Sequence, residues 1–219
     1  MTRRLKTDIP GPDRRVEPEE VREKGWEALF APALAPPLRL VVEIGFGRGE
    51  FLLDQAARAP ASAFLGVDVS RKRVLKMARR LARLEIANVR LVAARGEPVV
   101  DELLAPASVA TFWVNFSDPW PKKRHHRRRL VQPAFVHAMA TRLVPGGELH
   151  VATDDPSYAE WIDEVLPREA LLENVHAPAI HVREVPGRMQ TAYEREWRAR
   201  GRIPWFWSFR RAGRPEATP

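Results

Sequence analysis

Short apolar runs alternate with amphipathic stretches along most of this chain, beginning near Leu38. Runs of Val, Ile, Leu and Phe indicate buried strands, whereas apolar residues three and four positions apart indicate helices. The pattern predicts strands at Leu38–Ile44, Ala63–Val69, Asn88–Ala93, Val109–Phe116 and Glu148–Thr153. Two later strands are expected at Ile180–Glu184 and Ile203–Arg210.

Helices are predicted between these strands. Val74, Met77, Ala78 and Leu81 form one apolar stripe, and Ser70 is suited to cap the helix that carries it. Other helices are expected at Pro18–Phe30, from about Glu50, and at Pro98–Leu104, Pro133–Leu143, Pro156–Leu166 and Tyr193–Arg200. This alternation predicts an α/β fold, Rossmann-like, in which a mostly parallel central sheet has helices on both faces.

The periodic pattern also predicts how the 219 residues are divided. Residues 1–37 are rich in proline and charge, so we expect a partly flexible N-terminal arm with one packed helix. Residues 38–210 form the main domain, and residues 211–219 are expected to be a flexible polar tail.

A formal net charge of +8 favours a polyanionic partner, with nucleic acid ahead of an anionic membrane. No apolar run is long enough to span a bilayer, and none follows the basic start Met1–Lys6, so we expect a cytoplasmic protein without a secretory signal. Because cysteine is absent, disulfides and thiolate zinc sites are excluded. No metal site is expected.

The stretch after the strand Val109–Phe116 is the richest in candidate chemistry. Asp118 lies just past the strand, where Pro119 and Pro121 stiffen the backbone. Lys122–Arg129, here called the basic segment, follows with eight cationic or potentially cationic residues. Asp118 is either an Asx turn residue or a group that orients a base or balances its charge. The basic segment is either a solvated charge run or a phosphate-binding surface.

A second candidate is the glycine turn Gly45–Phe46–Gly47–Arg48–Gly49 between a strand and a helix. Such a turn is either a simple helix cap or a close backbone approach to a ligand. Glu50 stands where a dinucleotide fingerprint requires glycine. Glu43 before the turn favours a cationic ligand such as S-adenosylmethionine, and Asp68 is placed to accept hydrogen bonds from a ribose.

Two more polar groups are expected at the same edge of the sheet. Thr153–Asp154–Asp155 ends a strand, and Thr191–Ala192–Tyr193–Glu194–Arg195 opens a helix. Either group can simply cap a helix, Asp154 or Asp155 in the first and a Thr191–Glu194 capping box in the second.

Taken together, these motifs resemble the bacterial tRNA (guanine-N7-)-methyltransferase family. The resemblance runs from about Leu38 to Trp207 and is carried by the segments Glu43–Gly49, Asp118–Leu130, Ala152–Asp154 and Thr191–Glu194. It implies a class I methyltransferase fold and methyl transfer from S-adenosylmethionine to N7 of the guanosine at tRNA position 46, in the variable loop.

The resemblance also implies roles for individual residues. The cofactor would be bound by Glu43, Gly45, Gly47, Asp68, Glu97 and Asp118. Asp118 would also be the catalytic residue. The tRNA substrate would contact Lys122, Asp154, Thr191, Tyr193 and Glu194.

The chain departs from the family pattern at two places. Arg95 stands where the family has an acid that accepts a hydrogen bond from the adenine amino group, and guanidinium only donates. Glu97, two residues later, is the candidate replacement. Ala192 and Tyr193 replace the usual Lys and Phe before Glu194.

Other functions remain open at this point. A methyltransferase acting on an exocyclic amino group of DNA or RNA would fit the fold, although Trp120 stands where such enzymes have proline. A non-catalytic RNA-binding protein with a decayed pocket is a second alternative, and a nicotinamide dehydrogenase is disfavoured by Glu50. If the chain is a tRNA methyltransferase, we expect tRNA as its partner, no membrane association, no required protein partner, and a monomer or homodimer.

Overall fold

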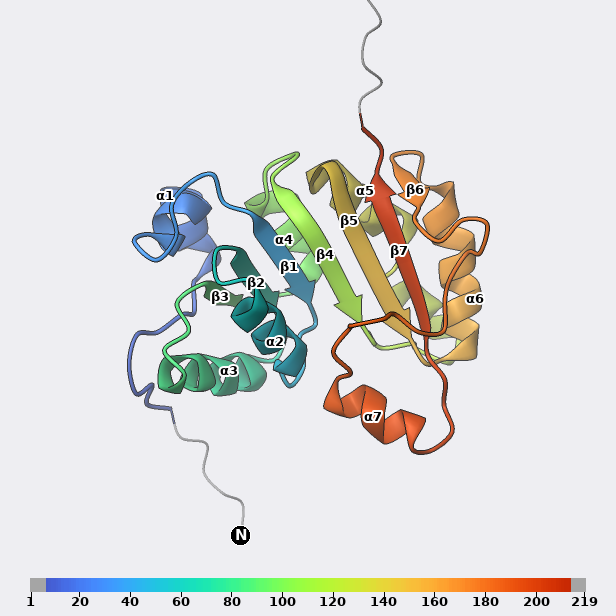
Figure 1. Ribbon diagram of the computed structural model, residues 1–219, viewed down its shortest axis with the longest axis horizontal. Helices are drawn as coiled ribbons and strands as arrows, with labels where there is room; N and C mark the ends of the chain where they lie inside the picture. Colours follow the sequence, from blue (N-terminus) through green and yellow to red (C-terminus); the bar gives the residue numbers. More distant parts are fainter. Residues whose placement is uncertain (1–6, 214–219) are drawn as a thin grey trace, which may run out of the picture.

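The computed structural model describes residues 7–213 and contains one seven-stranded sheet in the order β3-β2-β1-β4-β5-β7-β6 (Figure 1). β1 to β5 are parallel, and β7 runs antiparallel between β5 and β6. The strands are β1 (Leu40–Ile44), β2 (Ala63–Val67), β3 (Val89–Val92), β4 (Val109–Asn115), β5 (Leu143–Thr153), β6 (Leu172–Asn174) and β7 (Trp205–Arg211).

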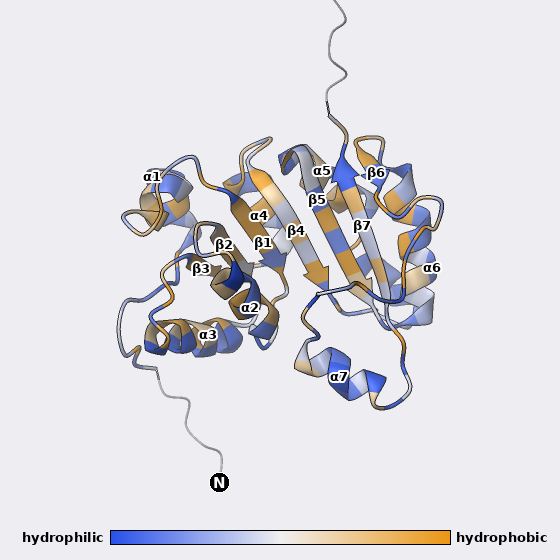
Figure 2. Cartoon of the chain, in the orientation of Figure 1, coloured by the Kyte–Doolittle hydropathy of each residue, from blue (hydrophilic) through white to orange (hydrophobic). Residues whose placement is uncertain are grey.

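Helices cover both faces of the sheet, which confirms the predicted α/β architecture (Figure 1). α2 (Glu50–Arg58) and α3 (Arg71–Arg83) pack on one face through a cluster that includes Leu52, Met77 and Leu81. The other face is covered by α4 (Gly96–Leu103), α5 (Pro133–Arg142) and α6 (Pro156–Val165). Figure 2 shows the central strands as largely hydrophobic and the outer sides of the helices as hydrophilic.

Six of the seven predicted strands, including Ile203–Arg210 as β7, and all the predicted helices are present, with ends that differ by a few residues. β5 begins at Leu143 instead of Glu148, because Leu143 already pairs with Val109, and the register shifts before Glu148 pairs with Thr111. A Cβ added at Gly147 would lie 3.0 Å from the carbonyl oxygen of Ala110, so glycine suits this close approach. The short helices η1 (Lys123–Arg128) and η2 (Leu166–Arg168), both of the 3-10 type, are not predicted.

The predicted strand at Ile180–Glu184 is wrong. Only Val182 pairs with β7, through two backbone hydrogen bonds of 2.9 Å with Phe206. The unpredicted strand β6 occupies the same edge of β7 further along, at Phe209–Arg211. The outer edge of β7 is therefore shared between two short segments, and neither has the length that gives a clear strand pattern.

The described part of the N-terminal arm lies against the main domain. α1 (Pro18–Phe30) is attached by the Trp26 indole, whose Nε1 donates to the carbonyl oxygen of Leu103 at 2.8 Å. Val16 donates its backbone N–H to Leu91 in β3 at 2.9 Å. The domain limits 1–37, 38–210 and 211–219 stay predictions, and most of the expected tail lies outside the described residues.

None of the helices within residues 7–213 combines the length and the apolar character that crossing a bilayer requires.

Candidate cofactor and substrate site

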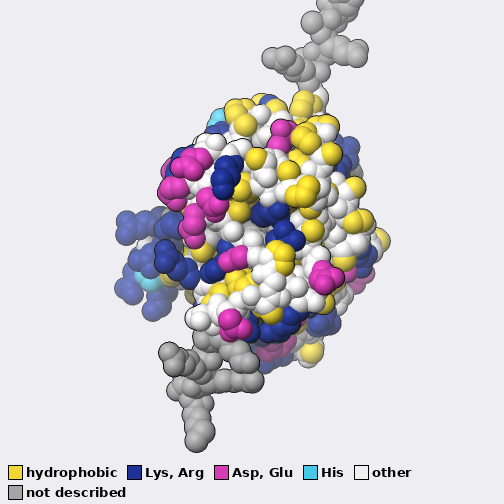
Figure 3. Space-filling view, turned by 90° about the vertical axis from the view of Figure 1, so that its left-hand side faces the viewer, with side chains coloured by type: hydrophobic (Ala, Val, Ile, Leu, Met, Phe, Trp, Pro, Cys, Tyr) yellow, Lys and Arg dark blue, Asp and Glu magenta, His cyan; other side chains and the backbone are white. Residues whose placement is uncertain are grey.

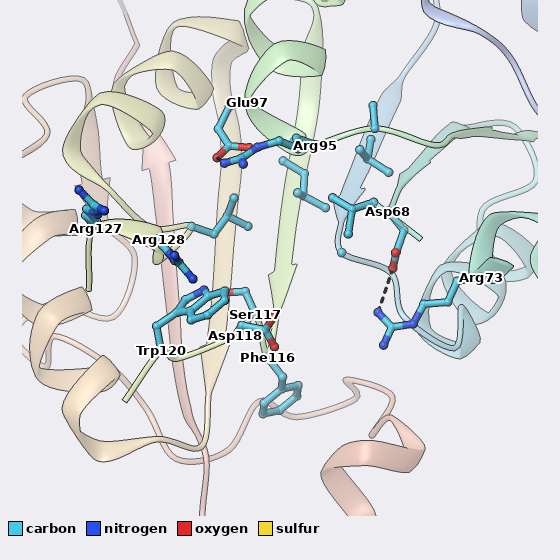
Figure 4. A pocket seen from close by; sticks show the side chains of 17 residues that line it. Asp68, Arg73, Arg95, Glu97, Phe116, Ser117, Asp118, Trp120, Arg127 and Arg128 are labelled. Carbon is cyan, nitrogen blue, oxygen red and sulfur yellow. Dashed lines mark hydrogen bonds and ion pairs between the residues drawn. The ribbon is translucent and has the colours of Figure 1, made fainter. Parts of the chain in front are cut away.

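The carboxyl ends of β1, β2, β3 and β4 surround a cavity of about 630 Å³ (Figure 4). Four of the predicted site residues line it: Gly45, Asp68, Glu97 and Asp118. β1 and β4 are direct neighbours in the sheet, so the glycine turn after β1 and the Asp118 turn after β4 open onto the same space. The remaining wall is formed by Ile44, Val67, Val69, Arg73, Ala94, Arg95, Gly96, Phe116, Ser117, Trp120, Arg127, Arg128 and Leu130.

The glycine turn takes a conformation that other residues avoid. Gly45, Gly47 and Gly49 have φ angles of 77°, 57° and 72°. The carboxylate of Asp68 fixes this turn, because its Oδ2 accepts the N–H of Gly47 at 3.1 Å and its Oδ1 accepts the N–H of Ser70 at 2.8 Å. A Cβ added at Gly45 would meet no atom within 4 Å, so the turn leaves open space beside its backbone.

Glu43 directly precedes Ile44 and Gly45 of the cavity wall but does not line the cavity, and it is almost completely buried. Its Oε1 accepts a hydrogen bond of 3.1 Å from Asn115 Nδ2, while its Oε2 makes no hydrogen bond within the described residues. Burial raises the pKa of Glu43 to about 7, against the lowering effects of Asn115, of the positive charge of Arg188 and of the nearby N–H of Leu52. The end of β1 therefore holds a buried carboxylate oxygen that has no hydrogen-bond partner among the described residues.

Arg95 and Glu97 form an ion pair at the far wall of the cavity, at the start of α4 (Figure 4). Arg95 Nη2 lies 2.8 Å from Glu97 Oε1. Burial raises the pKa of Glu97, but the hydrogen bond and charge of Arg95 and the backbone N–H of Glu97 itself outweigh burial, so the net pKa is lowered. Glu97 is thus a carboxylate acceptor two residues after the expected position.

The turn that carries Asp118 is strained on both sides. Phe116 and Trp120 have positive φ angles of 53° and 46°, which side-chain-bearing residues rarely adopt. The buried guanidinium of Arg129 holds the turn, because its Nε donates to the carbonyl oxygen of Pro119 at 2.9 Å. Its Nη2 donates to Ser157 Oγ at 2.8 Å. Asp118 itself is exposed at the cavity (Figure 4).

The basic segment therefore does not act as a uniform surface. Arg129 is buried and supports the Asp118 turn, so neither a solvated charge run nor a phosphate-binding surface describes the whole segment. Arg127 and Arg128 line the cavity, and the guanidinium of Arg128 lies 5.1 Å from the Trp120 ring centroid. Lys122 is exposed and is not part of the cavity wall.

The remaining predicted residues lie in or against the α7 segment, defined here as residues 180–204 around α7 (Ala192–Arg198). Asp154 is buried and accepts hydrogen bonds from Tyr193 Oη at 3.2 Å and from Arg202 Nη1 at 2.8 Å. The Tyr193 ring centroid lies 5.3 Å from that of Phe116, at the cavity wall. Burial and the neighbouring Asp154 raise the pKa of Tyr193 to about 12, so its hydroxyl stays a donor.

The helix-cap interpretations are settled by these contacts. Thr191 caps α7 by accepting the N–H of Glu194 at 3.0 Å, but Glu194 does not complete a capping box. Its buried carboxylate instead pairs with Arg188 at 2.6 Å and with Arg198 at 3.0 Å. Asp155, and not Asp154, caps α6 by accepting the N–H of Tyr158 at 2.9 Å.

Arg188 is the most informative residue that sequence reasoning missed. Its side chain is 5% exposed and links the two halves of the site. Nη1 donates to Glu194, while Nη2 donates to Asn115 Oδ1 at 2.8 Å. Because Asn115 in turn donates to Glu43, a continuous polar chain joins this buried acid at the end of β1 to the α7 segment. Arg188 stands apart from every recognisable motif, so only the folded structure reveals this link.

Val69 and Arg73 are further residues of the cavity wall that were missed. Val69 is 68% exposed, an unusual apolar surface directly after Asp68. Its position one residue past a strand-end acid is a signal that could have identified it.

Within residues 7–213 no group of three or more His, Cys, Asp or Glu side chains is placed to hold a metal ion.

Comparisons with known proteins agree with this geometry. The protein family described as "Putative methyltransferase" matches residues 38–206. A "tRNA (guanine-N(7)-)-methyltransferase" of Bordetella pertussis is 40% identical over 197 residues, covering 85% of this chain and 76% of that protein. The chain belongs to the tRNA (guanine-N7-)-methyltransferase family. A relative of the same name from Halorhodospira halophila is 42% identical over 161 residues, covering 74% of this chain and 70% of that protein.

Solved structures show the same fold at lower identity. The structure titled "Crystal Structure of 16S rRNA Methyltranferase KamB" matches with a TM-score of 0.57 and 18% identity, covering 79% of this chain and 87% of that chain. "Crystal structure of the aminoglycoside resistance methyltransferase NpmB1" matches with a TM-score of 0.55 and 18% identity, covering 89% and 93%.

S-adenosylmethionine is the methyl donor of this family, and the residues of the cavity fit it. The buried Glu43 Oε2 without a partner matches the ammonium group of the methionine moiety. The open space at Gly45 admits a close ligand, and the exposed side chain of Val69 offers an apolar wall for a flat base.

Proposed function

We propose that this protein is a tRNA (guanine-N7-)-methyltransferase that modifies the guanosine at position 46, in the variable loop. It acts in the cytoplasm, as a monomer or homodimer, without a required protein partner. The observation that carries the proposal is the convergence of three features on one cavity in a chain of this family. These are the glycine turn of Gly45, the carboxylate of Asp118 and the cations Arg127 and Arg128.

On this proposal, different residues at the cavity bind different parts of S-adenosylmethionine. Glu43, Gly45 and Gly47 hold the methionine moiety, and Asp68 accepts from the ribose. Glu97 accepts from the adenine amino group while Arg95 keeps it ionised. When bound, S-adenosylmethionine supplies a methyl group on a positively charged sulfur.

Asp118 is the proposed catalytic residue. Guanine N7 carries an in-plane lone pair, so no general base is needed, and catalysis consists of positioning and electrostatic stabilisation. As the N7–carbon bond forms and the carbon–sulfur bond breaks, positive charge moves from sulfur to the base. A carboxylate fixed on a strained turn is suited to accept hydrogen bonds from the guanine N1–H and 2-amino groups and to balance that charge.

The substrate roles divide according to burial. Lys122 and Tyr193 are exposed and are proposed to touch the tRNA. Thr191 caps α7 and presents that segment to the substrate. Asp154 and Glu194 are buried in ion pairs with Arg202, Arg188 and Arg198, so their proposed role is to shape the tRNA-facing surface.

The test is incubation with labelled S-adenosylmethionine and an unmodified tRNA transcript, followed by mapping of the modified base. We expect label at N7 of guanosine 46 and none in a transcript that carries another base there. Asp118→Asn should retain tRNA affinity and lose turnover by roughly 100-fold or more. Asp101→Asn, an exposed change on α4, is the matched control and should leave turnover unchanged. Label on an exocyclic amino group would contradict the proposal.

A further inference from the structure

Helix α3 presents a solvent face made only of cations. Every exposed position between its first and last residue is Lys or Arg, namely Arg71, Lys72, Arg73, Lys76, Arg80 and Arg83. The opposite side of the helix carries Val74, Met77, Ala78 and Leu81 and packs against α2 and the sheet. Because this apolar side is buried, the helix has no surface to insert into a bilayer.

The fold itself does not stabilise this arrangement. Among the described residues only Arg73, of the six exposed cations, has a carboxylate partner, Asp68 at 3.5 Å. The first turn of the helix contains no acid, although the helix dipole favours negative charge there. Lys72, Lys76 and Arg80 follow one another at four-residue spacing, where like charges repel. A polyanion beside this face would relieve the repulsion among its cations.

The position of α3 indicates which polyanion this is. Arg73 from its first turn lines the cavity, and Arg127 and Arg128 line the cavity from another side (Figure 4). At 13 residues the helix extends for about 20 Å away from that wall. Figure 3 shows Lys and Arg side chains gathered along the lower edge of the side on which α3 lies, apart from a projecting cluster that contains histidine.

We propose that the exposed face of α3 is a second phosphate-binding surface for the tRNA substrate. This inference rests on the proposed function. A guanosine that enters the cavity brings flanking sugar–phosphate backbone to both sides of the opening. The basic segment meets it on one side and α3 on the other. Lys and Arg on such a face contact phosphates and read no bases, so their contribution is independent of sequence and sensitive to salt.

The test compares two triple variants of equal charge. Lys72→Gln/Lys76→Gln/Arg80→Gln removes three cations from α3 and leaves Arg73 at the cavity in place. Arg39→Gln/Arg58→Gln/Arg168→Gln is the matched control, because these exposed cations lie just before β1 and at the ends of α2 and η2, and none lines the cavity. The pair of Arg58 with Asp54 is exposed on the arginine side and contributes little to stability. Affinity for an unmodified tRNA transcript is measured at several salt concentrations, together with S-adenosylmethionine affinity and thermal unfolding.

We expect the α3 variant to lose roughly 10- to 100-fold in tRNA affinity near 0.15 M salt, with a salt slope smaller by about two to three units. Its S-adenosylmethionine affinity should be unchanged, and its unfolding temperature the same or higher, because repulsion within α3 is relieved. The control should keep the wild-type slope.

Equal slopes for the two variants, while the wild-type protein methylates tRNA, would overturn this inference and leave the proposed function intact. Absence of methylation or tRNA binding by the wild-type protein would overturn both. Binding of the wild-type protein to phosphatidylserine vesicles that the α3 variant loses, with unchanged tRNA affinity, would assign the surface to membranes and also overturn it.

Discussion

Glu43 shows how burial changes the acid–base chemistry of a single residue. The folded protein raises its pKa from the ordinary 4.5 to about 7, mainly by removing the carboxylate from water. In the unliganded protein this lowers stability as the pH rises from about 4.5 to 7, because the unfolded chain ionises first. On the proposed function, a bound ammonium group would add a positive partner at Glu43 and recover this loss. We therefore interpret Glu43 as an acid whose ionisation is coupled to cofactor binding.

This coupling predicts a pH dependence of cofactor affinity. Below pH 7 a proton competes with the ammonium group for Glu43, so affinity for S-adenosylmethionine should fall by up to about tenfold per pH unit. Calorimetric titration between pH 5.5 and 7 measures the effect. Glu43→Gln should bind weakly and almost independently of pH over this range. An equally steep pH dependence in that variant would assign the effect to another group.

At the scale of elements, Arg188 is the buried residue that joins the α7 segment to the centre of the sheet. Arg188 joins Glu194 of α7 to Asn115 of β4, and its guanidinium lies 5.1 Å from the Phe51 ring and 4.8 Å from the Phe206 ring. Arg188→Met keeps the apolar contacts but leaves Glu194 with Arg198 alone. Breaking a buried pair in this way costs roughly 3 kcal/mol.

The lost stability should appear in the α7 segment and not in the sheet. By hydrogen exchange, Arg188→Met is expected to reduce protection of residues 180–204 by roughly 100-fold while the strands β1 to β5 keep theirs. Arg200→Gln is the matched control in the same segment, because its pair with Glu196 is exposed and contributes little. Uniform loss of protection over the whole sheet would mean that Arg188 stabilises the global fold instead.

The elements also show what a sequence can and cannot predict. Strands β1 to β5 and the glycine turn have local signatures, so the fold and four of the residues lining the cavity could be placed in advance. β6 has only three residues, and Val182 pairs alone, so neither carries a periodic pattern. Arg129 and Arg188 could not be assigned, because burial decides whether a cation supports the fold or faces a ligand, and burial depends on distant contacts.

At the scale of the whole molecule, two groups of cations meet at one opening. The basic segment and α3 approach the cavity from different sides, and both contribute side chains to its wall. The net charge of +8 is therefore expected to act locally at this opening and not as a uniform field.

This distribution predicts that cations outside the cavity affect tRNA affinity and not the rate of the chemical step. Lys122→Gln/Lys123→Gln/Arg124→Gln removes three exposed cations of the basic segment that do not line the cavity. We expect the salt slope of tRNA binding to decrease by about two to three units, while turnover at saturating tRNA stays near wild type, because Asp118 and Arg129 are untouched. Combined with the α3 triple variant, the losses should add, since the two groups share no partner. A collapse of turnover at saturating tRNA would instead place these three residues in the chemical step.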